Sequence, residues 1–246
     1  ALYIVMSKQH SNPSRRGPVV LCILDGWGER LETENNAIAL AQTPNWDNLV
    51  KSVPKSTLDA SAEQVGLPAG QMGNSEVGHM NLGAGRIVMQ DILRIDAAID
   101  DGSMAVNVSL LAYIKTIKET GGTCHLMGLM SPGGVHSHQN HIVSLAKILG
   151  KADIPTAIHA FTDGRDTPPK MGGDYLSQFI KDIEGLDKCQ IATVTGRYYA
   201  LDRDNRWDRI EQAYNAMAKG IGKTVSNPLI AISDAYEAKQ TDEFIL

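Results

Sequence analysis

The chain has 246 residues, of which 43% are hydrophobic and 21% are charged, so it can form one large globular domain or two modest ones. Its formal net charge of −5 excludes a generally basic surface, and we expect neither nucleic acid nor a membrane surface as the main partner. No apolar run has the length of a membrane-spanning helix.

The N-terminal region changes character at residue 18. Residues 1–17 lack the pattern of a signal sequence, and we expect them to form a flexible tail. The sequence PVVLCIL at 18–24 predicts a strand that is buried on both faces, as in a parallel sheet. Asp25 follows directly, at the end of the strand where open α/β sheets place their chemistry. A turn or helix cap is an equally good interpretation of Asp25 at this point.

The cysteines are few and scattered along the chain. Each lies in or beside an apolar run that predicts a strand, and together they are Cys22, Cys124 and Cys189. None has the spacing of a zinc site. We therefore expect buried free thiols in a reducing compartment, which makes the cytoplasm the expected location.

A glycine-rich segment follows two short predicted helices, at 35–41 and from 43, and a predicted strand at 57–60. Residues 70–79, GQMGNSEVGH, predict a loop that meets a helix N-terminus near Ser75. The backbone N–H groups there suit an anion, and the glycines would let a ligand approach the backbone. The alternative is that Asn74 or Ser75 is only the N-cap of the helix.

The second half of the chain alternates strands with helices. Amphipathic helices are predicted at 91–99 and 108–119, and strands at 123–130, 156–161 and 189–194, each followed by a loop and a helix. This alternation predicts a parallel sheet with helices packed on it. In the last of these helices, the residues at helical spacing are predicted to lie in the core: Trp207, Ile210, Tyr214 and Met217. Residues 224–246 show no complete element that closes the fold.

The loops after these strands leave the same edge of the predicted sheet. They carry basic, acidic and imidazole side chains, namely His136, Arg165, Asp166, Arg197 and Arg203. Such a set suits a small anion that bears hydroxyl groups. A metal site formed by His136, His138 and His141 is one alternative. Loop arginines that are merely solvated or ion-paired are the other.

Six motifs in the chain resemble those of a known family: LDGWG at 24–28, TPNWDNL at 43–49, GQMGNSEVGHMNLGAGR at 70–86, SPGGVHSHQNH at 131–141, DGRDTPP at 163–169 and GRYYALDRDNRWDR at 196–209. The chain resembles the N-terminal half of the cofactor-independent (2,3-bisphosphoglycerate-independent) phosphoglycerate mutases, a branch of the alkaline phosphatase superfamily. The resemblance implies an α/β fold of two α/β domains with mainly parallel sheets. It places residues 18–88 in a metal-binding phosphatase domain and 89–246 in an inserted, substrate-binding transferase domain, and we expect both to be incomplete.

The resemblance also implies a reaction, the interconversion of 3-phosphoglycerate and 2-phosphoglycerate in glycolysis and gluconeogenesis, without 2,3-bisphosphoglycerate. Ser75 is the implied catalytic nucleophile that becomes a phosphoserine. Asp25 and Ser75 are implied ligands of one of two divalent metal ions, usually Mn²⁺. The implied substrate ligands are His136, Arg165, Asp166, Arg197 and Arg203. Asp166 is the first candidate for acid–base work on the substrate hydroxyls, and His136 is the second.

The family has further metal and substrate ligands that are not among these 246 residues. We therefore expect this chain to be inactive alone, and the full-length protein to act as a monomer on a small-molecule substrate. Two alternatives stay open. Another metal-dependent phosphomutase or phosphohydrolase of the superfamily would share Asp25 and Ser75. A non-catalytic fragment would bind phosphoglycerate through the three loops and catalyse nothing.

Overall fold

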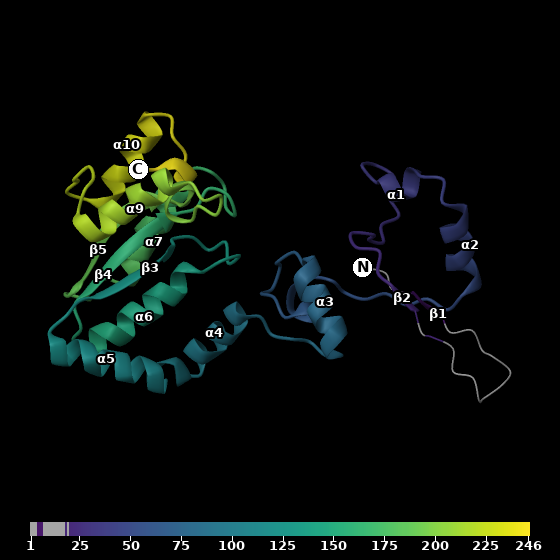
Figure 1. The fold of residues 1–246 in the computed structure, drawn as a ribbon, viewed down its shortest axis with the longest axis horizontal. Coiled ribbons are helices and arrows are strands. Elements are labelled where there is room, and N and C mark those ends of the chain that lie inside the picture. Colours follow the sequence, from purple (N-terminus) through teal and green to yellow (C-terminus); the bar gives the residue numbers. More distant parts are fainter. Residues whose placement is uncertain (1–3, 7–17, 19) are drawn as a thin grey trace. The chain divides into compact units, whose positions relative to one another are not determined.

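The structure is a computed structural model that describes residues 4–6, 18 and 20–246. It divides into unit 1, residues 1–90, and unit 2, residues 91–246 (Figure 1). Unit 1 contains β1 (Ile4–Met6), β2 (Val20–Cys22), α1 (Ala37–Leu40), α2 (Pro44–Ser52), the 3₁₀ helix η1 (Ala62–Val65) and α3 (Ser75–Ala84). Unit 2 contains α4 (Asp91–Asp100), η2 (Ser103–Val106), α5 (Val108–Thr120), β3 (Cys124–Leu129), α6 (Gln139–Lys151), β4 (Thr156–Thr162), α7 (Gly172–Asp182), β5 (Cys189–Gly196), α8 (Arg197–Ala200), α9 (Trp207–Lys219), α10 (Pro228–Glu237) and η3 (Asp242–Phe244). In the described part of the chain, every helix is too short or too polar to span a membrane.

The strand predicted at 18–24 differs from the strand found in the structure. β2 is shorter than 18–24 and pairs antiparallel with β1, so that Ile4 lies opposite Cys22. Val20 and Leu21 are 66% and 51% exposed, and Cys22 is exposed as well, so the predicted burial of this strand is wrong. β-branched residues favour a strand, but burial depends on what packs against it. Residues 4–6 of the expected tail form β1, while 1–3 and 7–17 lie outside the described residues.

The rest of unit 1 consists of short helices around a small core. The predicted helices at 35–41 and from 43 are confirmed as α1 and α2, but residues 57–60 form no strand. Val65, Leu67 and Val77 form the buried cluster of the unit. Three buried side chains are a small core for elements of this number, because hydrophobic stabilisation grows with the apolar area that is buried.

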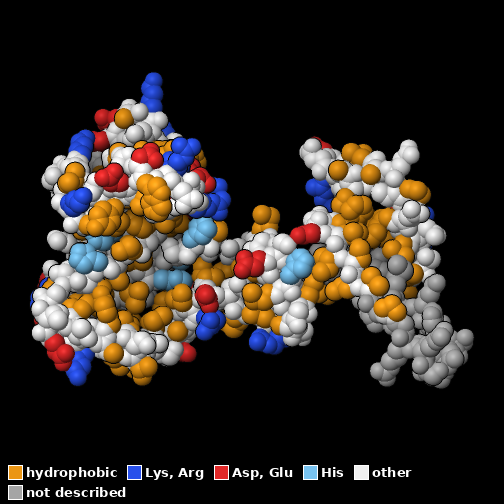
Figure 2. Space-filling model, in the orientation of Figure 1, with side chains coloured by type: hydrophobic (Ala, Val, Ile, Leu, Met, Phe, Trp, Pro, Cys, Tyr) orange, Lys and Arg blue, Asp and Glu red, His pale blue; other side chains and the backbone are white. Residues whose placement is uncertain are grey.

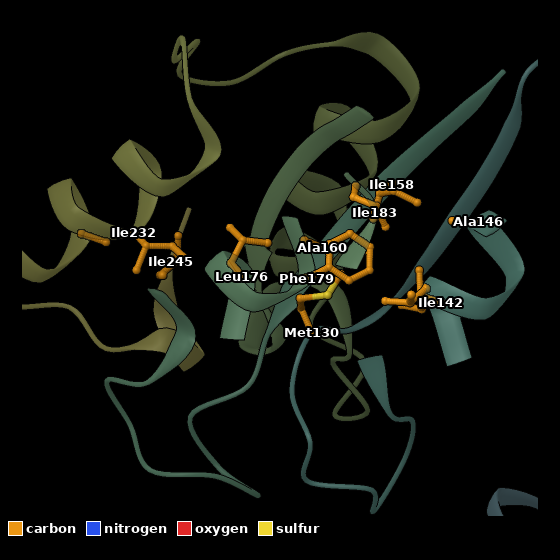
Figure 3. Close-up of a cluster of buried hydrophobic side chains, with 12 residues drawn as sticks. Met130, Ile142, Ala146, Ile158, Ala160, Leu176, Phe179, Ile183, Ile232 and Ile245 are labelled. Atoms are coloured by element: carbon orange, nitrogen blue, oxygen red, sulfur yellow. The ribbon is translucent and has the colours of Figure 1, made fainter. Parts of the chain in front are cut away.

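The sheet of unit 2 has three parallel strands in the order β3-β4-β5, which confirms the predicted α/β arrangement with a parallel sheet. All residues of the central strand β4 are buried, as expected for a strand covered on both faces. α6, α7 and α10 supply the side chains that pack against one face of this sheet. Figure 3 shows Met130, Ile158 and Phe179 among the residues of this core.

α9 lies beside β5 and corrects another prediction. Of its predicted core residues, Trp207 and Tyr214 are 72% and 56% exposed, whereas Ile210 and Met217 are half-buried. Helical spacing identifies an apolar face but does not say whether another element covers it. Among the cysteines of unit 2, Cys124 is buried and Cys189 is half-buried.

The segment from 224 to 246 closes unit 2, contrary to the sequence prediction. α10 begins after the N-cap Asn227, and its residues Ile232 and Ala235 join the core together with Ile245. The backbone N–H of Gly196 donates to the carbonyl of Ile245 at 2.6 Å. The signature of the helix was present in the sequence as Asn227 followed by Pro228, a favoured start of a helix.

Candidate active site

Ser75 and Asp25 lie together in unit 1. Ser75 is the first residue of α3, and its Oγ donates to Asp25 Oδ2 at 2.7 Å. Asn74 is the N-cap, because its side-chain oxygen accepts from the backbone N–H of Val77 at 3.1 Å. The hydroxyl of Ser75 is therefore not used for capping. Two hard oxygen atoms meet at the positive end of a helix dipole.

His79 is a third side chain at this place, and the sequence analysis did not single it out. Its Nδ1 lies 2.8 Å from the carbonyl oxygen of Ser75 and 3.2 Å from Ser75 Oγ. Since a carbonyl oxygen only accepts hydrogen bonds, Nδ1 carries the proton and donates toward Ser75. His79 therefore cannot take the hydroxyl proton through Nδ1. The spacing of four residues on one helix was the signal that could have found it.

The glycines before α3 are explained by the backbone of unit 1 itself. A Cβ atom on Gly73 would lie 1.7 Å from the carbonyl oxygen of Ala60, and Gly70 has a φ of +76°. Both positions require glycine for internal reasons. The sequence analysis explained these glycines by the approach of a ligand. The structure explains Gly73 by its contact with the backbone of Ala60 and Gly70 by its positive φ.

Unit 2 brings charged side chains together at the carboxyl ends of its strands. Arg197 follows β5, and its Nη1 donates to Asp163 Oδ1 at 2.7 Å and to Asp166 Oδ2 at 2.6 Å. His136, from the loop after β3, has its Nε2 3.7 Å from Asp166 Oδ2. The geometry thus joins His136, Asp166 and Arg197 in one network at one edge of the sheet.

Asp163 belongs to this network but was not among the predicted site residues. It is 2% exposed and accepts hydrogen bonds from Ser131 Oγ at 2.6 Å and from the backbone N–H groups of Asp166 and Arg165 at 2.9 and 3.2 Å. Burial acts to raise the pKa of Asp163, but these donors and Arg197 hold that pKa below its usual value. The sequence offered no signal that separates it from Asp166, because both lie in DGRD and only packing decides which one is buried.

Arg165 and Arg203 are both exposed on the loops of the same edge. For neither side chain does the part of the chain that the structure describes supply a hydrogen bond or ion pair. The loop of Arg203 is folded by Asp202, which accepts from the backbone N–H groups of Asp204 and Arg206 at 3.1 and 2.8 Å. The structure therefore fixes the loop backbone of Arg203 and leaves its side chain in solvent.

His138 and His141 serve other contacts. His138 caps α6, with Nδ1 accepting from the backbone N–H of Asn140, and His141 Nε2 lies 2.7 Å from Asp96 Oδ1 on α4. Within residues 4–6, 18 and 20–246, no group of three or more His, Cys, Asp or Glu is placed to hold a metal ion. The alternative of a metal site on His136, His138 and His141 thus gains no support from the geometry.

Comparisons with known proteins agree with the motifs. The family described as "BPG-independent PGAM N-terminus" matches residues 95–246, more than half of the chain. The chain is 51% identical over 229 residues to the 2,3-bisphosphoglycerate-independent phosphoglycerate mutase of Gluconobacter oxydans, which covers 93% of this chain and 44% of that protein. It is 52% identical over 231 residues to the protein of the same name from Rhodopseudomonas palustris, with 94% and 45% covered. The chain thus spans less than half the length of these relatives.

A solved structure shows the same likeness. The phosphoglycerate mutase of Leishmania mexicana, crystallised at low cobalt concentration, superposes with a TM-score of 0.71 at 31% identity. The match covers 84% of this chain and 40% of that chain. The family resemblance carried by the six motifs is therefore confirmed by sequence and by fold.

Proposed function

We propose that this chain is the N-terminal part of an enzyme that interconverts 3-phosphoglycerate and 2-phosphoglycerate. The chain belongs to the family of 2,3-bisphosphoglycerate-independent phosphoglycerate mutases. The observation that carries the proposal is the hydrogen bond of 2.7 Å between Ser75 Oγ and Asp25 at the start of α3. It prepares a serine to receive a phosphoryl group. Residues 18–88 would form part of the metal-binding phosphatase domain, and 89–246 would form part of the transferase domain.

Ser75 would be the nucleophile. A serine hydroxyl is a weak nucleophile at neutral pH and needs a partner that orients it and accepts its hydrogen bond, which Asp25 does. The substrate oxygen–phosphorus bond breaks as the bond from Ser75 Oγ to phosphorus forms, the Ser75 proton passes to the Asp25 carboxylate that accepts its hydrogen bond, and glycerate is left with a protonated oxygen. The other hydroxyl of glycerate then attacks the phosphoserine. Backbone N–H groups at the start of α3 favour the negative phosphoryl oxygens throughout.

Asp25 and Ser75 also fit a divalent metal ion in part. They supply two hard oxygen donors 2.7 Å apart, the kind of donor that Mn²⁺ favours. Such an ion, when bound, lowers the pKa of a coordinated hydroxyl and neutralises phosphoryl oxygens. We propose two divalent ions, Mn²⁺ in the cell, with the remaining ligands outside this chain.

The loops of unit 2 would hold the substrate. Arg165, Arg197 and Arg203 would bind its phosphate or carboxylate, since a guanidinium group pairs with either through two hydrogen bonds. Asp166 would give a proton to the glycerate oxygen that leaves in the first transfer and take one from the glycerate hydroxyl that attacks in the second, while Asp25 would return its proton to Ser75; His136 is the second candidate for the task of Asp166. Glycerate must stay bound between the two transfers, and these residues would retain it and exclude water. We further propose that the full-length protein acts as a monomer in the cytoplasm.

Ser75→Ala in the full-length protein tests the nucleophile. With Mn²⁺ present, we expect loss of mutase turnover and of the phosphoserine that mass spectrometry detects at residue 75, because the alanine has no oxygen to receive the phosphoryl group. Ser56→Ala is the matched control, since Ser56 is also an exposed serine of unit 1. Retained turnover in Ser75→Ala would remove Ser75 from the mechanism.

The same assays separate the alternatives. Wild-type protein that turns over phosphopentoses or aryl phosphates but not 3-phosphoglycerate would be another phosphomutase or phosphohydrolase of the superfamily. A full-length protein that binds 3-phosphoglycerate in calorimetry without turnover would be a binding protein. Inactivation by EDTA and recovery with Mn²⁺ are expected for the proposed enzyme.

A further inference from the structure

One buried carboxylate connects the ends of all the strands in unit 2. Asp163 follows β4, and its Oδ2 accepts from Ser131 Oγ, beyond β3, at 2.6 Å. Its Oδ1 accepts from Arg197 Nη1, after β5, at 2.7 Å. Ser131, Asp163 and Arg197 are only 0%, 2% and 8% exposed, so water competes little for these hydrogen bonds.

The same carboxylate orders the loop that carries two of the proposed substrate ligands. Asp163 Oδ1 also accepts from the backbone N–H groups of Arg165 at 3.2 Å and Asp166 at 2.9 Å. This arrangement fixes the backbone where both side chains begin. Because Asp163 is itself almost completely buried, it can act on a ligand only through Arg165, Asp166 and Arg197.

The contacts of Arg197 define which side of its guanidinium group is available. A guanidinium group has five N–H donors. Both donors of Nη1 are engaged, one by Asp163 at 2.7 Å and one by Asp166 at 2.6 Å. Among the described residues, no partner is found for Nε or Nη2. These remaining donors form an edge that can make two parallel hydrogen bonds to a phosphate or carboxylate.

We propose that Asp163 is a positioning residue of the substrate site: by holding Arg197 through Nη1, it presents the Nε–Nη2 edge of Arg197 to the carboxylate or phosphate of a small phosphorylated hydroxy acid. The proposal rests on the proposed function. Asp163 also shares Arg197 with Asp166. Without Asp163, Arg197 would keep its hydrogen bond to Asp166 alone, and one contact does not fix the orientation of the Nε–Nη2 edge.

The test is a double-mutant cycle in the full-length protein, read as the affinity for 3-phosphoglycerate in calorimetry. Asp163→Asn keeps the shape and one neutral acceptor but removes the charge that holds Arg197. We expect roughly a tenfold or greater loss of affinity, because hydrogen bonds between charged groups are the strong ones and Arg197 loses one of its two. In an Arg197→Ala background the same change should cost less than about twofold, because residues that act as a unit are not additive. Asp153→Asn is the matched control, since Asp153 is an exposed aspartate that pairs with Lys188.

Each outcome decides the proposal. Equal losses of affinity in the two backgrounds, or no loss in Asp163→Asn, would overturn it, because a merely structural role of Asp163 does not depend on Arg197. If Asp163→Asn proves unfolded, Ser131→Ala takes its place; it releases Asp163 Oδ2 alone and should weaken binding a few-fold, and unchanged binding would count against the proposal.

The proposed function can fail separately. If wild-type protein binds no 3-phosphoglycerate, that function is wrong, and the cycle is read with inorganic phosphate instead. Coupling between Asp163 and Arg197 in phosphate binding would then uphold the positioning role for another anion. A wild-type protein that binds neither ligand would overturn both proposals.

Discussion

The two units bury very different amounts of apolar side chain. Unit 2 has a cluster of twelve buried residues and a second of five, whereas the described residues of unit 1 form a cluster of three. Figure 2 shows hydrophobic side chains on the surface of the part that Figure 1 labels α1 and α2. Arg197 and its carboxylate partners therefore lie at the end of a well-packed sheet, while Ser75 and Asp25 contact each other across 50 positions of sequence beside a small core. Hydrogen bonds orient the site side chains in both units. In unit 2 these side chains also rest on a large packed core, and in unit 1 the core beside them is small.

The tryptophans allow the units to be followed separately. Trp27 and Trp46 of unit 1 contact each other edge to face, with ring centroids 5.3 Å apart, and Trp207 belongs to unit 2. In a protein with Trp27 and Trp46 changed to Phe, tryptophan fluorescence comes from unit 2 alone. In Trp207→Phe it comes from unit 1 alone.

The largest effect is expected in the core of unit 2. Phe179 on α7 is 0% exposed, and Phe179→Ala should lower the free energy of unfolding by about 3–5 kcal/mol, through lost burial and a cavity. Urea titration followed by Trp207 fluorescence measures it, and Tyr214→Ala, at a residue 56% exposed, is the control. A loss below about 1 kcal/mol would contradict the tight packing of this core.

A matched pair of valines compares the units directly. Val143 on α6 and Val77 on α3 are 7% and 3% exposed, and each belongs to the core of its unit. We expect Val143→Ala to cost about 2 kcal/mol and Val77→Ala about 1 kcal/mol, because Val77 has fewer neighbours around the space that is left. The reporters of each unit measure this in urea. An equal or larger loss for Val77→Ala would show that unit 1 is packed as tightly as unit 2.

The smallest effect concerns a second buried aspartate of unit 2. Asp242 is 1% exposed, and its carboxylate accepts from the backbone N–H groups of Met171 and Gly172 and from the hydroxyl of Tyr236. Burial raises the pKa of Asp242 above the usual 3.8 despite these donors. The folded state therefore binds this proton more tightly than the unfolded state, and stability falls as pH rises through the window above 3.8.

Asp242→Asn removes that dependence, because asparagine does not ionise. Relative to wild type, we expect the variant to gain stability between pH 4 and pH 7, by less than the change expected for Val143→Ala. Unfolding free energies of both proteins at these pH values measure the difference. If the difference in unfolding free energy stays constant with pH, or favours the wild type more as pH rises, then the pKa of Asp242 is not raised. Asp163→Asn should show no such gain, since the pKa of Asp163 is lowered.

Much of unit 2 could be predicted from local patterns. The alternation of predicted strands and helices defines a parallel sheet, and topology then brings His136, Asp166 and Arg197 to one edge. Asp163 could not be separated from Asp166 by sequence, because both lie in DGRD and only packing decides which one is buried. The exposure of Trp207 likewise depends on neighbours that spacing does not reveal.

Unit 1 was harder to predict because its contacts are distant in sequence. The sequence of β2 predicts a buried strand of a parallel sheet, whereas in the structure β2 pairs antiparallel with residues 4–6. Gly73 suggested that a ligand approaches the backbone, but the structure shows that the backbone of Ala60 lies against it. The local features of unit 1 were predicted: the helices α1 and α2, and the loop that meets a helix at Ser75.

The segment that closes unit 2 also affects the order in which the protein folds. Thr162 Oγ1 donates to the carbonyl of Asp242 across 80 positions of sequence, and Gly196, directly before Arg197, is fastened to Ile245. Contacts between residues so far apart in sequence close a long loop, and they form slowly for that reason. We therefore expect the ends of β4 and β5, which carry Asp163 and Arg197, to reach their final positions only together with residues 242–245. A ribosome must have synthesised residues 242–245 before the ends of β4 and β5 can make all of their contacts.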